Sequence, residues 1–241
     1  MSACEAERHT DDELVAQMST FIVAGMDSTA NALCRILQVL AERPDAQERL
    51  RAELIQASHG EDLAYDDLNK LPYLDAVCRE TLRVYAPATF TMREVAADTT
   101  LPLSKPIRGL DGTLMSEIPV PRGTFILLHN LGSNTNEDLW GEDAEEWKPE
   151  RWFGPLPAAV MEAPIPGIYS HLMTFSGGAR SCIGFKLSQL EMKIILLVLL
   201  SKFKFERTDK PITWNSAPAL YPTTGEESTK PEMFLKVTKI A

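Results

Sequence analysis

The sequence predicts a mainly α-helical fold with small β-sheets, an α+β domain. Helical patterns dominate: one runs from residue 10 to 43 without a strong breaker, and a second, strongly apolar one covers residues 183–200. Residues 89–95 and 123–128 have the composition of β-strands and are separated by turns rich in proline and glycine. With 241 residues and 44% apolar content, the chain is large enough to form one core over residues 1–241.

The first predicted helix begins at a capping box. The Thr10 hydroxyl can accept from the backbone N–H of Glu13, whose carboxylate can reach back to the N–H of Thr10. Pro44 ends the helix because it lacks an N–H and clashes with the preceding turn. Apolar residues lie on several faces, which predicts that this helix runs through the middle of the fold.

Further helices are expected before the first strand. Residues 46–58 predict a charged, solvated helix, residues 66–71 a helical turn, and residues 71–85 an amphipathic helix. On the last of these, Glu80 and Arg83 are three residues apart and therefore adjacent on the helix surface. Taken alone, that spacing describes equally well a surface ion pair worth about 0–1 kcal/mol.

The second half of the chain is less regular. Residues 153–174 are rich in proline and glycine and predict a loop, and residues 203–241 predict terminal strands and turns. Within the latter, residues 215–220 could reach back toward a pocket. The longest apolar run, residues 194–200, is far shorter than the ~20 residues that span a bilayer, so it predicts a buried helix face.

Charge and composition exclude several functions. The formal net charge of −10 argues against nucleic acid or an anionic membrane as an electrostatic partner. The four cysteines show no regular spacing, which fits a reducing compartment and gives neither a disulfide framework nor a zinc site. No signal peptide is visible, since polar and acidic residues follow Met1.

Residues 175–184, FSGGARSCIG, are the most distinctive stretch. They place Cys182 between glycines, two residues after Arg180 and at the start of the apolar helix, where the helix dipole favours a thiolate. The glycines allow the backbone to approach a flat, bulky group, and Arg180 suits a carboxylate. The alternative is a small cysteine buried at a loop–helix junction, which is what most free cysteines are.

The full spacing favours a specific site. Phe175, Gly178, Arg180, Cys182 and Gly184 match the pattern F-x-x-G-x-R-x-C-x-G at every fixed position. This stretch resembles the haem-binding loop of the cytochrome P450 family, the haem-thiolate monooxygenases. The resemblance implies that the cofactor is haem b, that Cys182 is the axial ligand of its iron, and that the other four residues help to bind it.

The same resemblance extends to the first helix. Residues 24–29, AGMDST, contain a glycine and polar residues that are poor helix formers; on their own they would be a solvent-facing polar patch. They are similar to the family's distal-helix pattern A-G-x-[DE]-T-[ST]. The resemblance gives Asp27 and Ser28, with Thr29 nearby, the catalytic task of carrying protons to dioxygen. Serine stands where the family usually has threonine, so the hydroxyl is kept without the methyl group that restrains its rotamer.

Other motifs of the family have matches here. Residues 148–152, KPERW, resemble the P-x-R-[FW] element, which implies a structural triad of Glu80, Arg83 and Arg151 beneath the haem. Arg93 corresponds to an arginine that contacts a haem propionate, although a plain surface arginine fits the sequence nearly as well. Residues 88–90 would line the substrate pocket.

The resemblance covers the C-terminal half of the family's usual length, which implies a fragment without the N-terminal anchor of eukaryotic members. Its implied reaction inserts one atom of dioxygen into an apolar organic substrate, with electrons from a flavoprotein reductase that docks on Lys148, Arg180 and Lys186. Its location would be intracellular, at the endoplasmic reticulum membrane if a full-length parent carries the anchor. Two alternatives remain: a non-catalytic haem-binding or structural remnant, and a haem-thiolate isomerase or peroxygenase.

Overall fold

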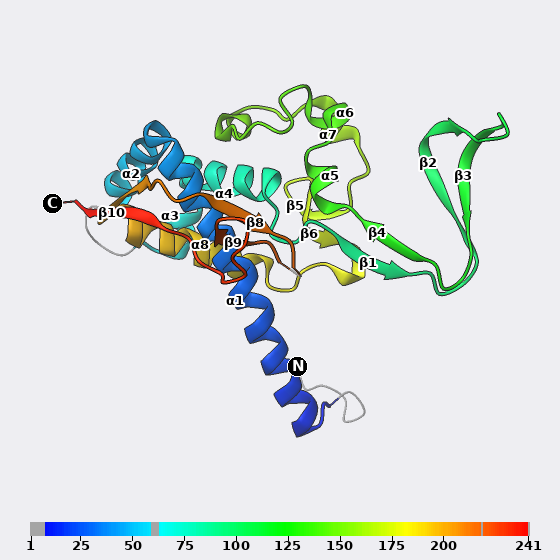
Figure 1. The fold of residues 1–241 in the computed structure, drawn as a ribbon, viewed down its shortest axis with the longest axis horizontal. Coiled ribbons are helices and arrows are strands. Elements are labelled where there is room, and N and C mark those ends of the chain that lie inside the picture. Colours follow the sequence, from blue (N-terminus) through cyan, green and yellow to red (C-terminus); the bar gives the residue numbers. More distant parts are fainter. Residues whose placement is uncertain (1–7, 59–62, 218, 241) are drawn as a thin grey trace.

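A computed structural model describes residues 8–58, 63–217 and 219–240 of the chain. Its longer helices form one cluster and its strands form small separate sheets (Figure 1). The helices are α1 (Asp11–Glu42), α2 (Pro44–Ser58), α3 (Tyr65–Asn69), α4 (Pro72–Val84), α5 (Asn130–Asn134), α6 (Glu137–Trp140), α7 (Ala158–Glu162) and α8 (Phe185–Leu200). The arrangement confirms the predicted α+β class.

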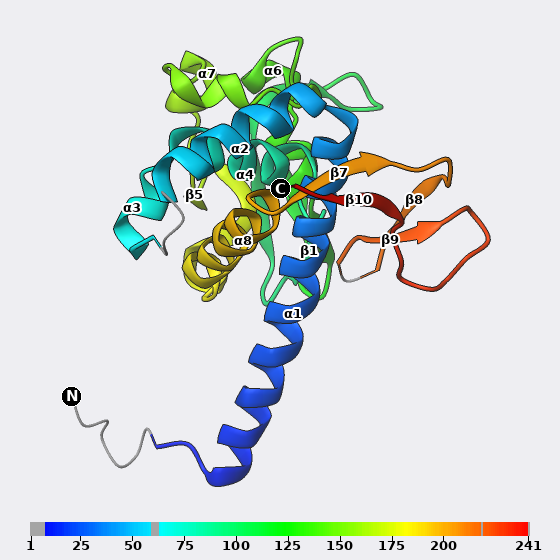
Figure 2. The same cartoon turned by 90° about the vertical axis from the view of Figure 1, so that its left-hand side faces the viewer.

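Helix α1 has two different halves. Its capping box is present, with Thr10 N donating to Glu13 Oε2 at 2.8 Å and Glu13 N donating to Thr10 Oγ1 at 3.3 Å. Only the C-terminal half enters the core, whereas the N-terminal half stands away from the body (Figure 2). The expectation that the whole helix runs through the middle is therefore wrong: Phe21 is 54% exposed and Ile22 is 66% exposed, because no described segment packs against them.

The core lies where α1, α2, α4 and α8 meet. Ile36 and Leu40 of α1 and Val77 of α4 are among its most buried residues. Helix α8 contributes residues four positions apart, which place one stripe of its surface inward. The expected burial of residues 194–200 is correct for that stripe only, since Ile194 is 44% and Val198 47% exposed on the opposite side.

Each sheet is an antiparallel pair of strands. The pairs are β1 (Thr91–Glu94) with β4 (Phe125–Leu128), β2 (Thr99–Arg108) with β3 (Leu114–Val120), β5 (Gly167–Tyr169) with β6 (Leu172–Gly177), β7 (Phe203–Arg207) with β10 (Leu235–Lys239), and β8 (Ile212–Asn215) with β9 (Tyr221–Thr224). The β2–β3 hairpin, which the sequence did not predict, projects beside the sheet formed by β1 and β4 (Figure 1). The stretch predicted as a loop contains α7, β5 and the start of β6.

No helix in the described ranges combines the length and the apolar character needed to cross a bilayer.

Candidate functional site

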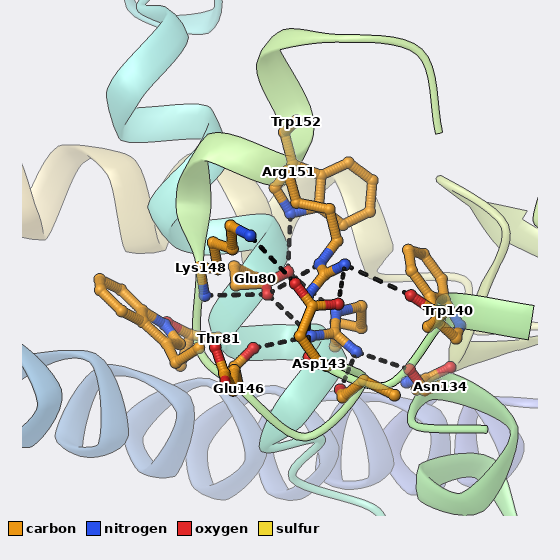
Figure 3. Close-up of polar contacts among 12 residues, drawn as sticks. Glu80, Thr81, Asn134, Trp140, Asp143, Glu146, Lys148, Arg151 and Trp152 are labelled. Carbon is orange, nitrogen blue, oxygen red and sulfur yellow. Dashed lines mark hydrogen bonds and ion pairs between the residues drawn. The ribbon is translucent and has the colours of Figure 1, made fainter. Parts of the chain in front are cut away.

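The structure brings the three residues of the expected triad together, and Figure 3 shows Glu80 and Arg151 side by side in this cluster. Glu80 and Arg83 lie one turn apart on α4 and are both fully buried, with Arg83 Nη2 2.8 Å from Glu80 Oε1 and Arg83 Nε 2.9 Å from Glu80 Oε2. Arg151 comes from the 3-10 helix Pro149–Phe153, and its Nε donates to Glu80 Oε1 at 3.3 Å. A buried pair of this kind is retained only when further hydrogen bonds compensate for the loss of water.

Those further hydrogen bonds are present. The backbone N–H of Lys148 donates to Glu80 Oε1 at 3.0 Å, and the indole N–H of Trp152 donates to Glu80 Oε2 at 2.9 Å. Arg83 also donates to three backbone carbonyls, of Asn134 and Glu146 at 3.0 Å each and of Ala144. The ion pair therefore ties α4 to α5 and to the segment from residue 144 to 152.

A second carboxylate lies at the rim of this cluster. Asp143 Oδ1 accepts from Arg151 Nη1 at 2.9 Å, and Asp143 Oδ2 accepts from Lys148 Nζ at 3.0 Å. The hydrogen bond from Arg151, and then that from Lys148, lower the pKa of Asp143 to about 2. Arg151 thus joins a half-buried carboxylate to a fully buried one.

The cysteine loop is held by its own backbone and by β5. The N–H of Cys182 donates to the carbonyl of Phe175 at 2.9 Å, and Ser176 and Gly178 adopt φ angles of 58° and 70°. A Cβ on Gly177 would lie 2.2 Å from the carbonyl oxygen of Pro166, the residue before β5, so only glycine fits there without displacing this backbone. Helix α8 begins at Phe185 with Gly184 as its N-cap, so Cys182 precedes the helix rather than occupying its first turn.

A cavity of about 650 Å³ lies between α1 and the cysteine loop. Its wall includes Ser28, Thr29, Ala88, Phe175, Arg180, Cys182 and Gly184. Cys182 is an exposed free cysteine, whereas Cys78 is buried. The expected ligand therefore opens onto a cavity rather than lying inside the core, which removes the alternative of a buried junction cysteine.

The polar residues of the distal-helix motif occupy different surroundings. The Ser28 hydroxyl donates to the carbonyl of Ala24 at 2.9 Å and borders the cavity. Thr29 is buried and its hydroxyl donates to Ser188 Oγ on α8 at 3.3 Å, so it bridges the two helices. Asp27 is exposed and is not part of the described cavity wall.

Other expected residues are only partly gathered at the cavity. Arg93 Nη1 donates to the carbonyl of its neighbour Met92 at 2.9 Å and lies outside the described cavity wall. Ala88 borders the cavity, but Phe90 does not. The N–H of Leu220 donates at 2.8 Å to the carbonyl of Pro87, a residue of the cavity wall, but no described residue from 215 to 220 itself borders the cavity.

Three polar residues of this region carried no sequence motif. Asn130 and Asn134 are almost fully buried at the two ends of α5, and the Oδ1 atom of Asn130 has no partner among the described residues. Ser188 faces Thr29 across the gap between the helices. Because their roles depend on contacts 40 to 159 positions away along the chain, no local spacing could indicate them.

Comparisons with known proteins agree with these observations. A family model described as Cytochrome P450 matches residues 2–225. The chain is 59% identical to a ganoderic acid synthetase of Ganoderma lucidum and 57% identical to cytochrome P450 monooxygenase 91 of Postia placenta. These matches cover 98% and 100% of this chain but 44% of each relative, so the chain spans less than half of their length.

A solved structure gives the same result for the fold. A crystal structure of a cytochrome P450 superposes with a TM-score of 0.74 at 26% sequence identity, covering 97% of this chain and 47% of that one.

Proposed function

Since the chain belongs to the cytochrome P450 family, we propose that it carries the cysteine-ligand and proton-handling part of a haem-thiolate monooxygenase. The observation that carries the proposal is the position of Cys182, an exposed thiol on the wall of a cavity, in a loop whose backbone is held by Phe175. In this proposal residues 1–241 form part of one domain rather than a domain of their own.

The residues present fit haem b. Cys182 would supply the axial thiolate, and no group of three or more histidine, cysteine or carboxylate side chains in the described ranges offers another metal site. Gly184 leaves space beside the thiol, Phe175 closes one wall, and Arg180 would provide a cation for a propionate, whereas Gly178 lies outside the described cavity wall and would serve the turn of the loop. Arg93, whose guanidinium now contacts Met92, would have to turn to reach a second propionate. When bound, the haem would supply the redox-active iron that dioxygen chemistry requires.

The remaining chemistry is assigned to α1. The Ser28 hydroxyl donates its single proton to the Ala24 carbonyl at the edge of the cavity, so its oxygen can accept there, and it would donate into the cavity only after rotating away from Ala24. Exposed Asp27 would exchange protons with solvent and pass them to this hydroxyl. Thr29, already bonded to Ser188, would keep α1 at a fixed separation from α8.

The substrate and partners follow the same proposal. Alanine and leucine side chains, among them Ala24, Ala32 and Leu82, line part of the cavity, which suits an apolar organic substrate. Arg180 and Lys186 are exposed close to the cysteine loop, where a flavoprotein reductase would bring acidic side chains. Lys148, already paired with Asp143, would contribute less than these two.

Titration of the purified 241-residue chain with ferric haem tests the proposal. Binding followed by the Soret absorbance is expected to be saturable at one haem per chain and to weaken at least tenfold in Cys182→Ser. Cys34→Ser is the matched control because Cys34 lies on α1 away from the cavity wall. Equal binding by both variants would contradict the assignment of Cys182, and no saturable binding would favour the haem-free structural alternative.

A further inference from the structure

The buried amide of Asn134 connects two parts of the site that the sequence motifs leave separate. Asn134 is 1% exposed and ends α5. Its Oδ1 accepts from the backbone N–H of Met173 at 2.7 Å, and its Nδ2 donates to Thr174 Oγ1 at 2.8 Å. Its own backbone carbonyl accepts from Arg83 Nη1 at 3.0 Å (Figure 3). One residue therefore contacts the charged cluster and strand β6.

Strand β6 leads directly into the cysteine loop. Thr174 is followed by Phe175, whose carbonyl accepts the Cys182 N–H at 2.9 Å. The Thr174 hydroxyl also donates to the carbonyl of Leu82 on α4 at 2.8 Å, one residue before Arg83. A path of hydrogen bonds and covalent backbone thus runs from Arg83 through Asn134 and β6 to the N–H of Cys182.

We propose that Asn134 is a positioning residue that sets β6, and with it the Cys182 loop, against the buried Glu80–Arg83–Arg151 cluster. A carboxamide suits this place because it offers an acceptor and a donor on one short side chain, and both are used here. Loss of the amide would leave the Met173 N–H without its buried acceptor. The importance of this effect rests on the proposed role of Cys182, but the position of the loop can be measured without haem.

Gln47 provides a matched control. Like Asn134, it is a buried amide whose side chain both accepts from and donates to a strand. Its Oε1 accepts from Phe205 N at 2.9 Å, and its Nε2 donates to the Phe205 carbonyl at 2.8 Å. It joins α2 to β7, away from the cysteine loop. The Gln47 amide also donates to the Leu40 carbonyl at 2.9 Å and accepts from Arg51 Nη2 at 3.1 Å, so Gln47→Leu removes more buried hydrogen bonds than Asn134→Leu does, but from a different place, which makes it a stringent control.

The experiment measures amide hydrogen exchange in the haem-free chain labelled with ¹⁵N-cysteine. Cys34 on α1 and Cys78 on α4 report the opening of those helices, whereas Cys182 reports the loop. In Asn134→Leu the exchange of the Cys182 amide is expected to accelerate about 30-fold relative to Cys34 and Cys78, the effect of losing two net hydrogen bonds. In Gln47→Leu the ratio of these rates should stay within about twofold of the original chain.

Equal acceleration of all the assigned amides in Asn134→Leu, or none, would overturn the proposal. If that variant does not fold, Asn134→Asp takes its place, because aspartate keeps the acceptor for the Met173 N–H and loses the donor to Thr174. The exchange of the Cys182 amide is then expected to accelerate about fivefold relative to Cys34 and Cys78. Absence of this acceleration would refute the proposal. Haem titration of the same samples separates the two claims, because weak haem binding by the original chain would count against the proposed function and leave the exchange result unaffected.

Discussion

Replacement of Arg83 by methionine tests the energetics of the buried cluster. The change removes the donors to Glu80 and leaves the carbonyls of Asn134, Ala144 and Glu146 without this partner. Glu80 keeps only the donors from Lys148 N, Arg151 Nε and Trp152 Nε1, yet it remains fully buried. Because removing one partner of a buried ion pair costs about 3–5 kcal/mol, we expect the free energy of unfolding to fall by about 4 kcal/mol.

Urea unfolding followed by far-UV circular dichroism measures this loss. Arg207→Met is the control, since Arg207 Nε lies 3.9 Å from Glu42 Oε1 and the Arg207 side chain is 62% exposed. An exposed pair of this kind contributes about 0–1 kcal/mol, so the control should differ little from the original chain. A loss below about 1 kcal/mol for Arg83→Met would refute the view that the cluster is a compensated, water-free network.

Three further predictions address other parts of the molecule. Hydrogen bonds from Arg151 and Lys148 depress the pKa of Asp143 to about 2, so its ion pair stabilises the fold fully above about pH 4 and this stabilisation is lost as pH falls through 2. Asp143→Asn should therefore cost about 1 kcal/mol at pH 7 and clearly less at pH 2, where half of the carboxyl is protonated, and urea titrations showing a pH-independent difference would contradict this. Burial raises the pKa of the Cys78 thiol to about 12, so iodoacetamide should modify Cys182 in the folded chain and Cys78 only in urea, as peptide mass spectrometry can show. The exposed apolar half of α1 should drive self-association. Ile22→Glu should therefore lower the sedimentation coefficient of concentrated samples without changing the unfolding midpoint. An unchanged sedimentation coefficient would argue against self-association through this surface.

The sequence predicted those features that depend on local spacing. The capping box at Thr10, the end of α1 before Pro44 and the i,i+3 pair of Glu80 and Arg83 all follow from helix geometry. The glycines and the cysteine of residues 175–184 have a fixed spacing, which is why that motif indicates the family and a candidate site from sequence alone.

Features that depend on distant contacts could not be predicted. Asn134 lies in a stretch that reads as an ordinary polar turn, and its importance comes from Thr174, which is 40 residues away. The apolar pattern alone does not predict the exposure of Phe21, because such a pattern reports that a face favours burial, not that a described partner covers it. The β2–β3 hairpin was missed because Pro102 and Pro106 argue against a strand, and the register shifts between Pro102 and Ile107 accommodate them.

The ligand role of Cys182 is the central claim, and the carbon monoxide difference spectrum tests it most directly. The haem-loaded chain is reduced with dithionite, exposed to carbon monoxide and compared with Cys182→Ser treated in the same way. We predict a strongly red-shifted Soret band for the original chain, the mark of thiolate ligation, and its loss in the variant. A band at the position of a neutral ligand in the original chain would contradict the account.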